Sequence, residues 1–296
     1  MAAGQKRLIW FGSRAALLLV GIIWGSSLVV VKSSAERIAP NLVIASRFTL
    51  ACIVLSLIFF RKFRLLNREY LKSGLIIGAC LFVAYWLQTL GVTLAMPGKS
   101  AFLSSIYCVL VPFVFWAIGG GRPRARNLVA ACLCVAGILL SSVTADFSIL
   151  PGDLLALASG LFFAVHIAAV GRYGSGKDPV LITILQFGFC AIFAWIATFT
   201  LEGFAIRWHL DAAGGVLYLA LACTALALLL QNVGQKYADP ASASILMSTE
   251  SVFGVIFSVI FMGETLNSRL LLGFVLIFAS VLISEVPFPV LRKRAA

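Results

Sequence analysis

Residues 231–264, QNVGQKYADPASASILMSTESVFGVIFSVIFMGE, decide the fold, because the same arrangement occurs earlier, at residues 88–121. Each copy has an apolar segment, a short break that contains proline, and a second apolar segment that is rich in serine and small residues. Similarity at a fixed spacing indicates an internal duplication. The matched pairs, all 143 positions apart, are Gln88 with Gln231, Gly91 with Gly234, Ala95 with Ala238, Pro97 with Pro240 and Gly120 with Gly263.

The duplication extends to the amino-terminal part of each copy, where the spacing is 139 positions. The change in spacing implies four extra residues in the second copy, most simply in the loop LEGFAIRWHLDAAGG at residues 201–215. We therefore divide the chain into a first repeat, residues 1–146, and a second repeat, residues 147–296. The pairs matched here are Gly21 with Gly160, Pro40 with Pro179, Phe48 with Phe187 and the polar Arg47 with Gln186.

The composition indicates an integral membrane protein. The chain is 61% hydrophobic and 11% charged, with a mean hydropathy of +1.06, whereas soluble domains have about 25% charged residues. Its apolar runs match the roughly 20 residues that a helix needs to cross a bilayer, and they lack the alternation of a membrane β-barrel. We predict ten transmembrane helices, at 15–32, 41–60, 73–95, 100–119, 128–143, 153–171, 180–201, 214–235, 241–262 and 269–286.

The net charge of +12 reflects membrane topology. With the amino terminus in the cytoplasm, 17 of the 23 Lys and Arg residues fall on the cytoplasmic side. This bias is what the positive-inside rule predicts for a multi-pass protein of the plasma (inner) membrane with both termini in the cytoplasm. We therefore expect no nucleic-acid partner. The opposite side holds Lys32, Arg37, Lys99, Arg207 and Arg269, and Arg47 lies within a predicted helix.

Each repeat has five predicted spans, and this odd number means that the second repeat enters the membrane from the opposite side. The fold class is therefore an all-α integral membrane protein with two inverted five-helix repeats. Such repeats place a site between the two halves, which is the usual architecture of a secondary transporter.

Polar residues within the predicted spans are the candidates for that site. Tyr85 and Gln88 lie on one helix face, and Gln231 is the repeat equivalent of Gln88. Amide side chains in a membrane also hold helices together, so contact with a substrate and helix packing remain equal alternatives. Tyr107 follows a stripe of serines at helical spacing.

Glu250 occupies the position in the second repeat that Tyr107 has in the first. It is the one acidic residue that we place near the middle of the membrane, where we expect it to be protonated, paired with a cation or exposed to an aqueous cavity. We favour a role in binding substrate or protons over a structural hydrogen bond.

Three further residues have competing interpretations. His166 could serve proton coupling, although an isolated histidine within a membrane is more often a satisfied hydrogen-bonding residue. Lys32 either extends to the interface or contacts a ligand. Arg47 either ties a helix end or lipid headgroup in place or anchors a substrate carboxylate.

The motifs WGSSLVVVK at residues 24–32, Arg47-Phe48, and SILMSTESVFGVIFSVIFMGETL at residues 244–266 resemble those of the drug/metabolite transporter (DMT) superfamily, in its EamA-like branch. The resemblance covers nearly the whole chain. It implies a ten-helix carrier with cytoplasmic termini and a central cavity, and it matches Trp24 to the motif of the first span. Ser251 stands where the family often has proline, and Gly121 stands where its first repeat often ends in glutamate.

We therefore expect a secondary transporter or facilitator of small polar or amphiphilic organic solutes, such as amino acids or related metabolites, that works by alternating access. Export is a candidate direction, protons are a candidate coupling ion, and membrane lipid is the surrounding partner. The alternative is a lipid or drug flippase of the same fold. A membrane enzyme is disfavoured, because no catalytic residues, metal site or cofactor motif is recognisable. The predicted substrate-binding residues are Trp24, Tyr85, Gln88, Tyr107, His166, Gln231 and Glu250.

Overall fold

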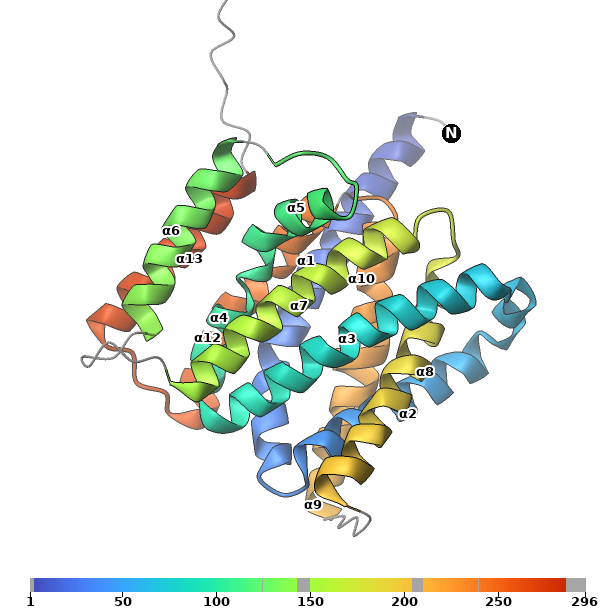
Figure 1. The fold of residues 1–296 in the computed structure, drawn as a ribbon, viewed down its shortest axis with the longest axis horizontal. Coiled ribbons are helices and arrows are strands. Elements are labelled where there is room, and N and C mark those ends of the chain that lie inside the picture. The colour runs from blue at the N-terminus through green and yellow to red at the C-terminus, as the bar shows by residue number, and fades with distance from the viewer. Residues whose placement is uncertain (1–2, 124, 143–149, 204–209, 239, 286–296) are drawn as a thin grey trace, which may run out of the picture.

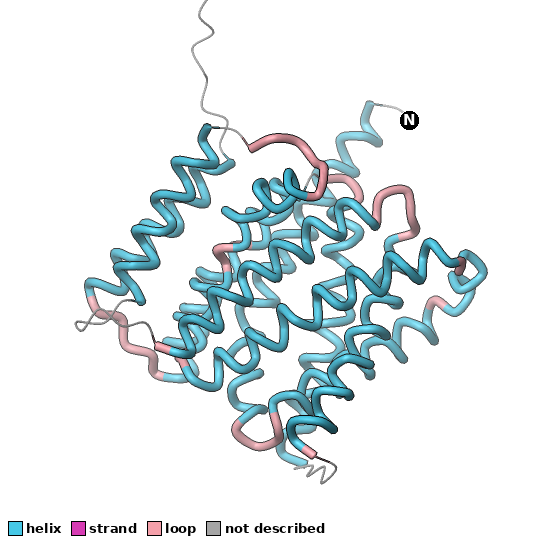
Figure 2. The backbone as a smooth tube through the Cα atoms, in the orientation of Figure 1, coloured by secondary structure: helices cyan, strands magenta, loops and turns pink. Residues whose placement is uncertain are grey.

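The structure is a computed structural model that describes residues 3–123, 125–142, 150–203, 210–238 and 240–285. Every regular element in these ranges is a helix, and no strand occurs among them (Figure 2). The all-α prediction is therefore confirmed. The predicted boundary between the repeats, at residues 146 and 147, lies outside the described residues, as do Arg207 and the basic tail at residues 292–294.

The helices of the first half of the chain are α1 (Ala3–Ala35), α2 (Pro40–Ile58), the 3-10 helix η1 (Phe60–Leu65), α3 (Arg68–Leu94), α4 (Pro97–Ser104), α5 (Tyr107–Ala117) and α6 (Ala125–Ser142). The second half has α7 (Pro151–Tyr173), α8 (Pro179–Ala197), the π-helix η2 (Thr198–Glu202), α9 (Leu210–Tyr218), the π-helix η3 (Leu219–Leu226), α10 (Ala227–Gln235), α11 (Pro240–Met247), α12 (Thr249–Met262) and α13 (Ser268–Glu285).

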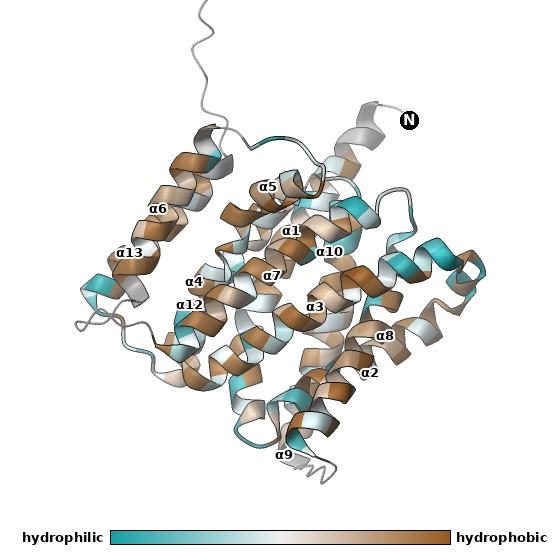
Figure 3. Cartoon of the chain, in the orientation of Figure 1, coloured by the Kyte–Doolittle hydropathy of each residue, from teal (hydrophilic) through white to brown (hydrophobic). Residues whose placement is uncertain are grey.

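Eight helical segments are long and apolar enough to cross a membrane among the residues that the structure describes. The apolar parts of α6 and α13 are shorter, at residues 127–140 and 268–280. Apolar residues cover the helices, and hydrophilic ones gather towards helix ends and loops (Figure 3). The chain is therefore a multi-pass membrane protein, and the count of ten spans stays a prediction.

Proline begins five of the helices. Pro40, Pro97, Pro151, Pro179 and Pro240 are the first residues of α2, α4, α7, α8 and α11. Proline is favoured at the first helical position, because its fixed φ suits the helix and its missing N–H would have no partner there. These prolines explain why the helix starts could be placed from the sequence to within a few residues.

The helix contacts come in matched sets. Helix α1 of the first half packs on α12 of the second half. Helix α7 of the second half packs in the equivalent way on α4 and α5 of the first half. Likewise α3 packs on α7 while α10 packs on α1, and α3 packs on α8 while η3 packs on α2. The pairs α2 with α8 and α6 with α13 join corresponding helices, and α6 and α13 run side by side at one edge of the bundle (Figure 1). Exchanging the two halves leaves this contact pattern unchanged.

Glycines allow α1 and α12 to approach closely. A methyl group added at Gly25 would lie 2.5 Å from Cβ of Phe253 and 2.9 Å from the backbone nitrogen of Gly254. Small residues at such a crossing let two helix backbones come close enough for van der Waals contact to hold them together within a bilayer. The crossing places residues 24–27 of α1 beside the first turns of α12.

Asp178 links the loop between α7 and α8 to η1. Its Oδ1 accepts hydrogen bonds from the N–H groups of Val180 and Leu181 at 3.0 and 3.2 Å, so it caps α8. Its Oδ2 lies 2.6 Å from Nζ of Lys62. Burial alone would raise the pKa of Asp178, but the ion pair with Lys62 and the two N–H donors lower it below the ordinary 3.8.

Replacing Asp178 with Asn should keep the cap and lose the ion pair, at a cost of about 1 kcal/mol or less because the pair is partly exposed. A carboxyl group whose pKa is lower in the folded protein than in the unfolded chain stabilises the fold at pH values above the unfolded pKa. This contribution disappears as the pH falls through the folded pKa. Melting temperatures in detergent should therefore differ between the parent and Asp178→Asn at pH 7, and the difference should shrink as the pH falls below 3.8 and through the lower folded pKa. An equal difference at both pH values would contradict this account.

Candidate functional site

Two helices are interrupted at equivalent positions near the centre of the bundle. The break between α4 and α5 is at Ser105 and Ile106, and the break between α11 and α12 is at Ser248, which is 143 positions after Ser105. The hydroxyl of Ser105 donates to the carbonyl of Ala101 at 2.7 Å, and that of Ser248 donates to the carbonyl of Ile245 at 2.7 Å. Serine side chains that bond to the preceding turn compete with the helix ladder.

Pro112 lies inside α5, and the break between α4 and α5 comes before it. The interruption has a direct consequence for the site. Tyr107 is the first residue of α5, and Glu250 is in the first turn of α12, so each half-helix has a residue singled out in the sequence within its first turn. A carboxylate in a first helical turn interacts favourably with the helix dipole.

A central pocket lies where these half-helices meet. Its walls come from α1, α3, α5, α7, α10 and α12. All seven residues predicted to bind substrate lie on it, and three further residues, Ser27, Phe163 and Ile167, complete it. The structure thus brings the predicted residues together, and their role in binding stays a prediction. The full lining is Trp24, Ser27, Tyr85, Gln88, Tyr107, Phe163, His166, Ile167, Gln231 and Glu250.

Repeat-equivalent residues share this pocket. Eight of its ten lining residues form four pairs, two with the spacing of 143 positions and two with the spacing of 139. Phe163, which sequence reasoning did not select, could have been found in this way from its partner. The pairs are Gln88 with Gln231, Tyr107 with Glu250, Trp24 with Phe163 and Ser27 with His166.

Tyr107 and Glu250 are in direct contact. The hydroxyl of Tyr107 donates a hydrogen bond to Oε2 of Glu250 at 3.4 Å, and both side chains are buried. Glu250 forms no ion pair with any cation among the described residues. Of the three environments expected for this carboxylate, pairing with a cation is therefore not found among the residues that the structure describes.

The amide and imidazole groups of the pocket form hydrogen bonds of different lengths, and one amide oxygen has no hydrogen-bond partner. Gln88 donates to Oγ of Ser104 at 3.4 Å, and Nε2 of His166 lies 3.0 Å from Oε1 of Gln186. Gln231 donates to Gln235 at 3.0 Å, while its Oε1 is buried without a hydrogen-bond partner. A long bond and an unpaired acceptor in a buried pocket leave hydrogen-bonding capacity for a ligand.

Trp24 is fixed by its indole N–H, which donates to the carbonyl of Cys223 in η3 at 2.9 Å. Tyr85 is enclosed by aromatic rings, with Phe48 and Phe163 packed edge-on at 5.1 and 5.2 Å. The pocket therefore combines polar groups with aromatic walls, which is the usual composition of a site for a small organic ligand.

The pocket is closed in this structure. Its volume is about 10 Å³, roughly the space that a single water molecule requires. An organic solute can enter only if the surrounding helices separate. The described residues also contain no group of three or more His, Cys, Asp and Glu side chains placed to hold a metal ion.

Arg47 lies one layer behind the pocket. Its side chain is 1% exposed, its Nε donates to Oγ1 of Thr224 at 2.8 Å, and its guanidinium stacks over the ring of Tyr85 at 4.8 Å. Its Nη2 has no hydrogen-bond partner. The expectation that Arg47 contacts a lipid headgroup is wrong, because the side chain is buried and donates to Thr224 in the π-helix η3. Its role as an anchor for a substrate carboxylate stays a prediction.

Charged groups join the helices at the end of the bundle where α4 starts. Glu264 accepts hydrogen bonds from the N–H groups of Gly98 and Lys99 at 2.9 and 3.1 Å. Nζ of Lys99 lies 2.6 Å from the buried Asp153. Lys32 donates to the carbonyl of Ala95 at 2.7 Å, so it binds the end of α3 instead of extending freely to the interface. These contacts join α1, α3, α4, α7 and the end of α12.

The chain is similar to a known family and to known proteins. The sequence model of the EamA-like transporter family matches residues 13–143 and, a second time, residues 150–285. A curated protein of Archaeoglobus fulgidus, described as an uncharacterized transporter, is 31% identical over 283 residues, which cover 95% of this chain and 87% of the relative. The uncharacterized transporter YvbV of Bacillus subtilis is 26% identical, covering 91% of this chain and 90% of the relative.

A solved crystal structure has a similar fold. It superposes with a TM-score of 0.67 at 19% sequence identity and covers 92% of this chain and 97% of its own. At this identity the likeness concerns the fold alone. The two matched family segments, 13–143 and 150–285, fall on either side of the boundary that we placed between the repeats.

Proposed function

Because this chain belongs to the EamA-like transporter family, we propose that it is a secondary transporter that moves small polar or amphiphilic organic solutes, such as amino acids or related metabolites, through the central pocket. Transport proceeds by alternating access between two inverted five-helix repeats that span the inner membrane ten times, with both termini in the cytoplasm. Export is a candidate direction of net transport.

The observation that carries this proposal is the origin of the pocket. Four pairs of repeat-equivalent residues line it, and the helix contacts keep their pattern when the halves are exchanged. A site shared in this way by two similar halves can be closed from either side, as alternating access requires. The volume of about 10 Å³ fits a closed intermediate of such a cycle.

Uptake or counterflow in proteoliposomes tests the proposal. Gln88→Ala and Gln231→Ala should each raise the KM about fivefold to tenfold for a verified solute, because a hydrogen bond contributes roughly 1 kcal/mol and tenfold corresponds to 1.4 kcal/mol. Gln235→Ala is not a neutral control, since it contacts Gln231. The exposed Glu36→Gln is a suitable one. Unchanged KM values for both pocket variants would show that the site is elsewhere.

A second candidate function, a lipid or drug flippase of the same fold, is favoured by one observation. An apolar groove of about 690 Å³ lies between α1, α12 and the end of α9. Tyr218 and Ser26 share a hydrogen bond of 2.6 Å within it. Translocation of a fluorescent phospholipid in the same proteoliposomes, blocked by Ser26→Trp, would favour the flippase over the solute carrier. The groove is lined by Ile22, Ile23, Ser26, Val29, Val30, Ser33, Tyr218, Phe257, Phe261 and Met262.

A further inference from the structure

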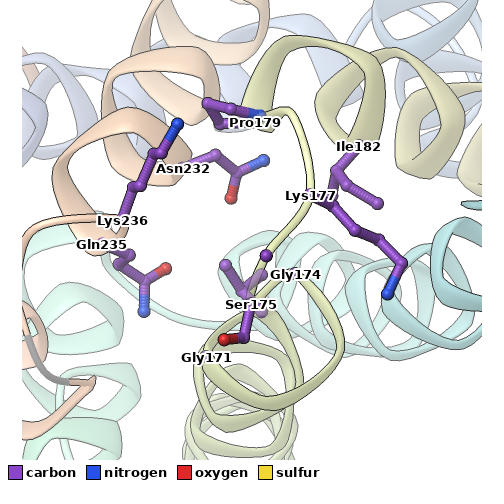
Figure 4. Close-up of a pocket in the computed structure, with 11 residues that line it drawn as sticks. Gly171, Gly174, Ser175, Lys177, Pro179, Ile182, Asn232, Gln235 and Lys236 are labelled. Carbon is purple, nitrogen blue, oxygen red and sulfur yellow. The ribbon is translucent and has the colours of Figure 1, made fainter. Parts of the chain in front are cut away.

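A second polar cavity lies at the end of the bundle opposite to the one where α4 starts. It is formed by the carboxyl-terminal ends of α7 and α10, the loop that follows α7, and the start of α8 (Figure 4). Its volume is about 120 Å³, whereas one water molecule needs roughly 10–15 Å³. The residues that line it are Val170, Gly171, Gly174, Ser175, Gly176, Lys177, Pro179, Ile182, Asn232, Gln235 and Lys236.

The cavity is positively charged. Lys177 and Lys236 belong to its lining, and none of the described residues that line it is acidic. Nζ of Lys177 donates to the carbonyl of Tyr173 at 3.1 Å and points away from the cavity in Figure 4. Lys236 is therefore the ammonium group that is more available to an acid group of a ligand.

Asn232 adds a group that lacks a partner. Its side chain is 3% exposed, and its Nδ2 donates to Oγ1 of Thr183 at 2.7 Å. Its Oδ1 is buried without a hydrogen-bond donor and points towards the open centre of the cavity (Figure 4). A buried acceptor is costly until a donor reaches it, so the arrangement suits a ligand that carries an N–H or O–H group.

One layer of side chains separates this cavity from the central pocket. Gln235 lines the cavity, accepts a hydrogen bond from Gln231 at 3.0 Å and donates one to the carbonyl of Ile167 at 3.3 Å. Gln231 and Ile167 both line the central pocket. If Gln235 lost its two hydrogen bonds, to Gln231 and to Ile167, the polar contacts between the cavity and the central pocket would be broken.

We propose that this cavity is a vestibular binding site for small dissolved solutes that carry both an acid group and a hydrogen-bond donor, as α-amino acids and α-hydroxy acids do. Lys236 binds the acid group and Oδ1 of Asn232 accepts from the donor. The solute passes to the central pocket when the bridge from Gln235 to Gln231 and Ile167 opens. This inference rests on the proposed transport function.

An aminophospholipid headgroup presents the same two chemical groups. The position of the cavity favours a dissolved solute, because the cavity adjoins the polar side chains of α10 that continue to Gln231. The experiment therefore compares both sources of the ligand.

The test uses labelling of Ser175→Cys in the purified full-length protein, since Ser175 is exposed at the rim of the cavity. A charged thiol reagent is applied in lipid-free detergent, and the parent protein corrects for labelling of the native cysteines. A mixture of L-serine, L-alanine, L-threonine and lactate should slow labelling several-fold. Propionate and serinamide, which each carry one of the two groups, should protect less.

Two variants and their controls examine the chemistry. Lys236→Gln and Asn232→Leu, each combined with Ser175→Cys, should raise the solute concentration for half-protection about tenfold, as expected for loss of a charge-assisted or buried hydrogen bond. Lys72→Gln removes an exposed lysine outside the cavity and should retain protection. Thr183→Val breaks the bond that holds the Asn232 amide but keeps its Oδ1, so it should weaken protection less than Asn232→Leu does.

Three results would overturn the inference. They are the absence of protection by the mixture, an equal loss of protection in the variants and their controls, and protection that is given only by phosphatidylethanolamine or phosphatidylserine added to the detergent micelles. Uptake by the parent is measured in parallel. If the parent transports a solute that does not protect Ser175→Cys, the vestibular site is wrong and the transport function stands. If the parent transports none of the solutes but they protect the cysteine, the transport function fails and the binding site stands.

Discussion

Replacing Glu250 with Gln is expected to reduce the initial rate of solute uptake by about tenfold to a hundredfold and to remove its dependence on an imposed pH gradient. The carboxylate lies on the central pocket, is buried, and accepts a hydrogen bond from Tyr107 at 3.4 Å. An ionised carboxylate in such a place is costly unless it gains a cation or a proton. Hydrogen bonds to charged groups contribute roughly 1.5–3 kcal/mol, which corresponds to the expected loss of rate.

The measurement compares uptake into proteoliposomes with and without an inward proton gradient. Glutamine keeps the shape and the hydrogen-bonding capacity of the side chain but does not release a proton. The groups beside Glu250 that also bear titratable atoms are Tyr107, Tyr85 and His166, so His166→Gln is measured in parallel. Glu36→Gln makes the same chemical change at an exposed position and should transport normally. A Glu250→Gln protein that still responds to the gradient would exclude this carboxylate as the coupling group.

The duplication made several residues of the central pocket recognisable in the sequence. Gln88 with Gln231 and Tyr107 with Glu250 were visible as polar positions in apolar segments, and the structure places all four on one pocket. Phe163 and Ile167 were missed, since an apolar residue in a membrane span gives no contrast with its neighbours. Only the repeat partner of Phe163, Trp24, carried a signal for it.

Helix interruptions and long-range polar contacts were less accessible. The breaks occur at Ser105 and Ser248, where hydroxyl groups bond to the preceding turn. Sequence spacing does not reveal such local competition. The contact of Lys99 with Asp153 joins residues 54 positions apart, and its geometry depends on how α4 packs on α7. Charge patterns predicted which residues were unusual, but not which partner each would find.

Replacing Arg47 with Met is expected to abolish most transport while leaving the melting temperature unchanged or higher. Arg47 is 1% exposed, and it forms no ion pair with the other residues that the structure describes. A buried charge without an ion-pair partner is costly, so an apolar side chain of similar length should not destabilise the protein. This cost points to a functional use of the positive charge beside Tyr85, which lines the pocket.

The charge can act on the pocket without touching the solute. Two unit charges 4 Å apart interact by about 4 kcal/mol at an effective dielectric constant of 20, and proportionally less at longer distances. Arg47 would thus stabilise the carboxylate of a solute in the pocket beside Tyr85, and substitution would remove this effect. Thr224→Val removes the hydrogen-bond partner of Nε and keeps the charge, so it should reduce transport far less. A clear fall in the melting temperature of Arg47→Met, with transport reduced only in proportion to the folded fraction, would instead assign Arg47 a structural role through Thr224 and the π-helix η3.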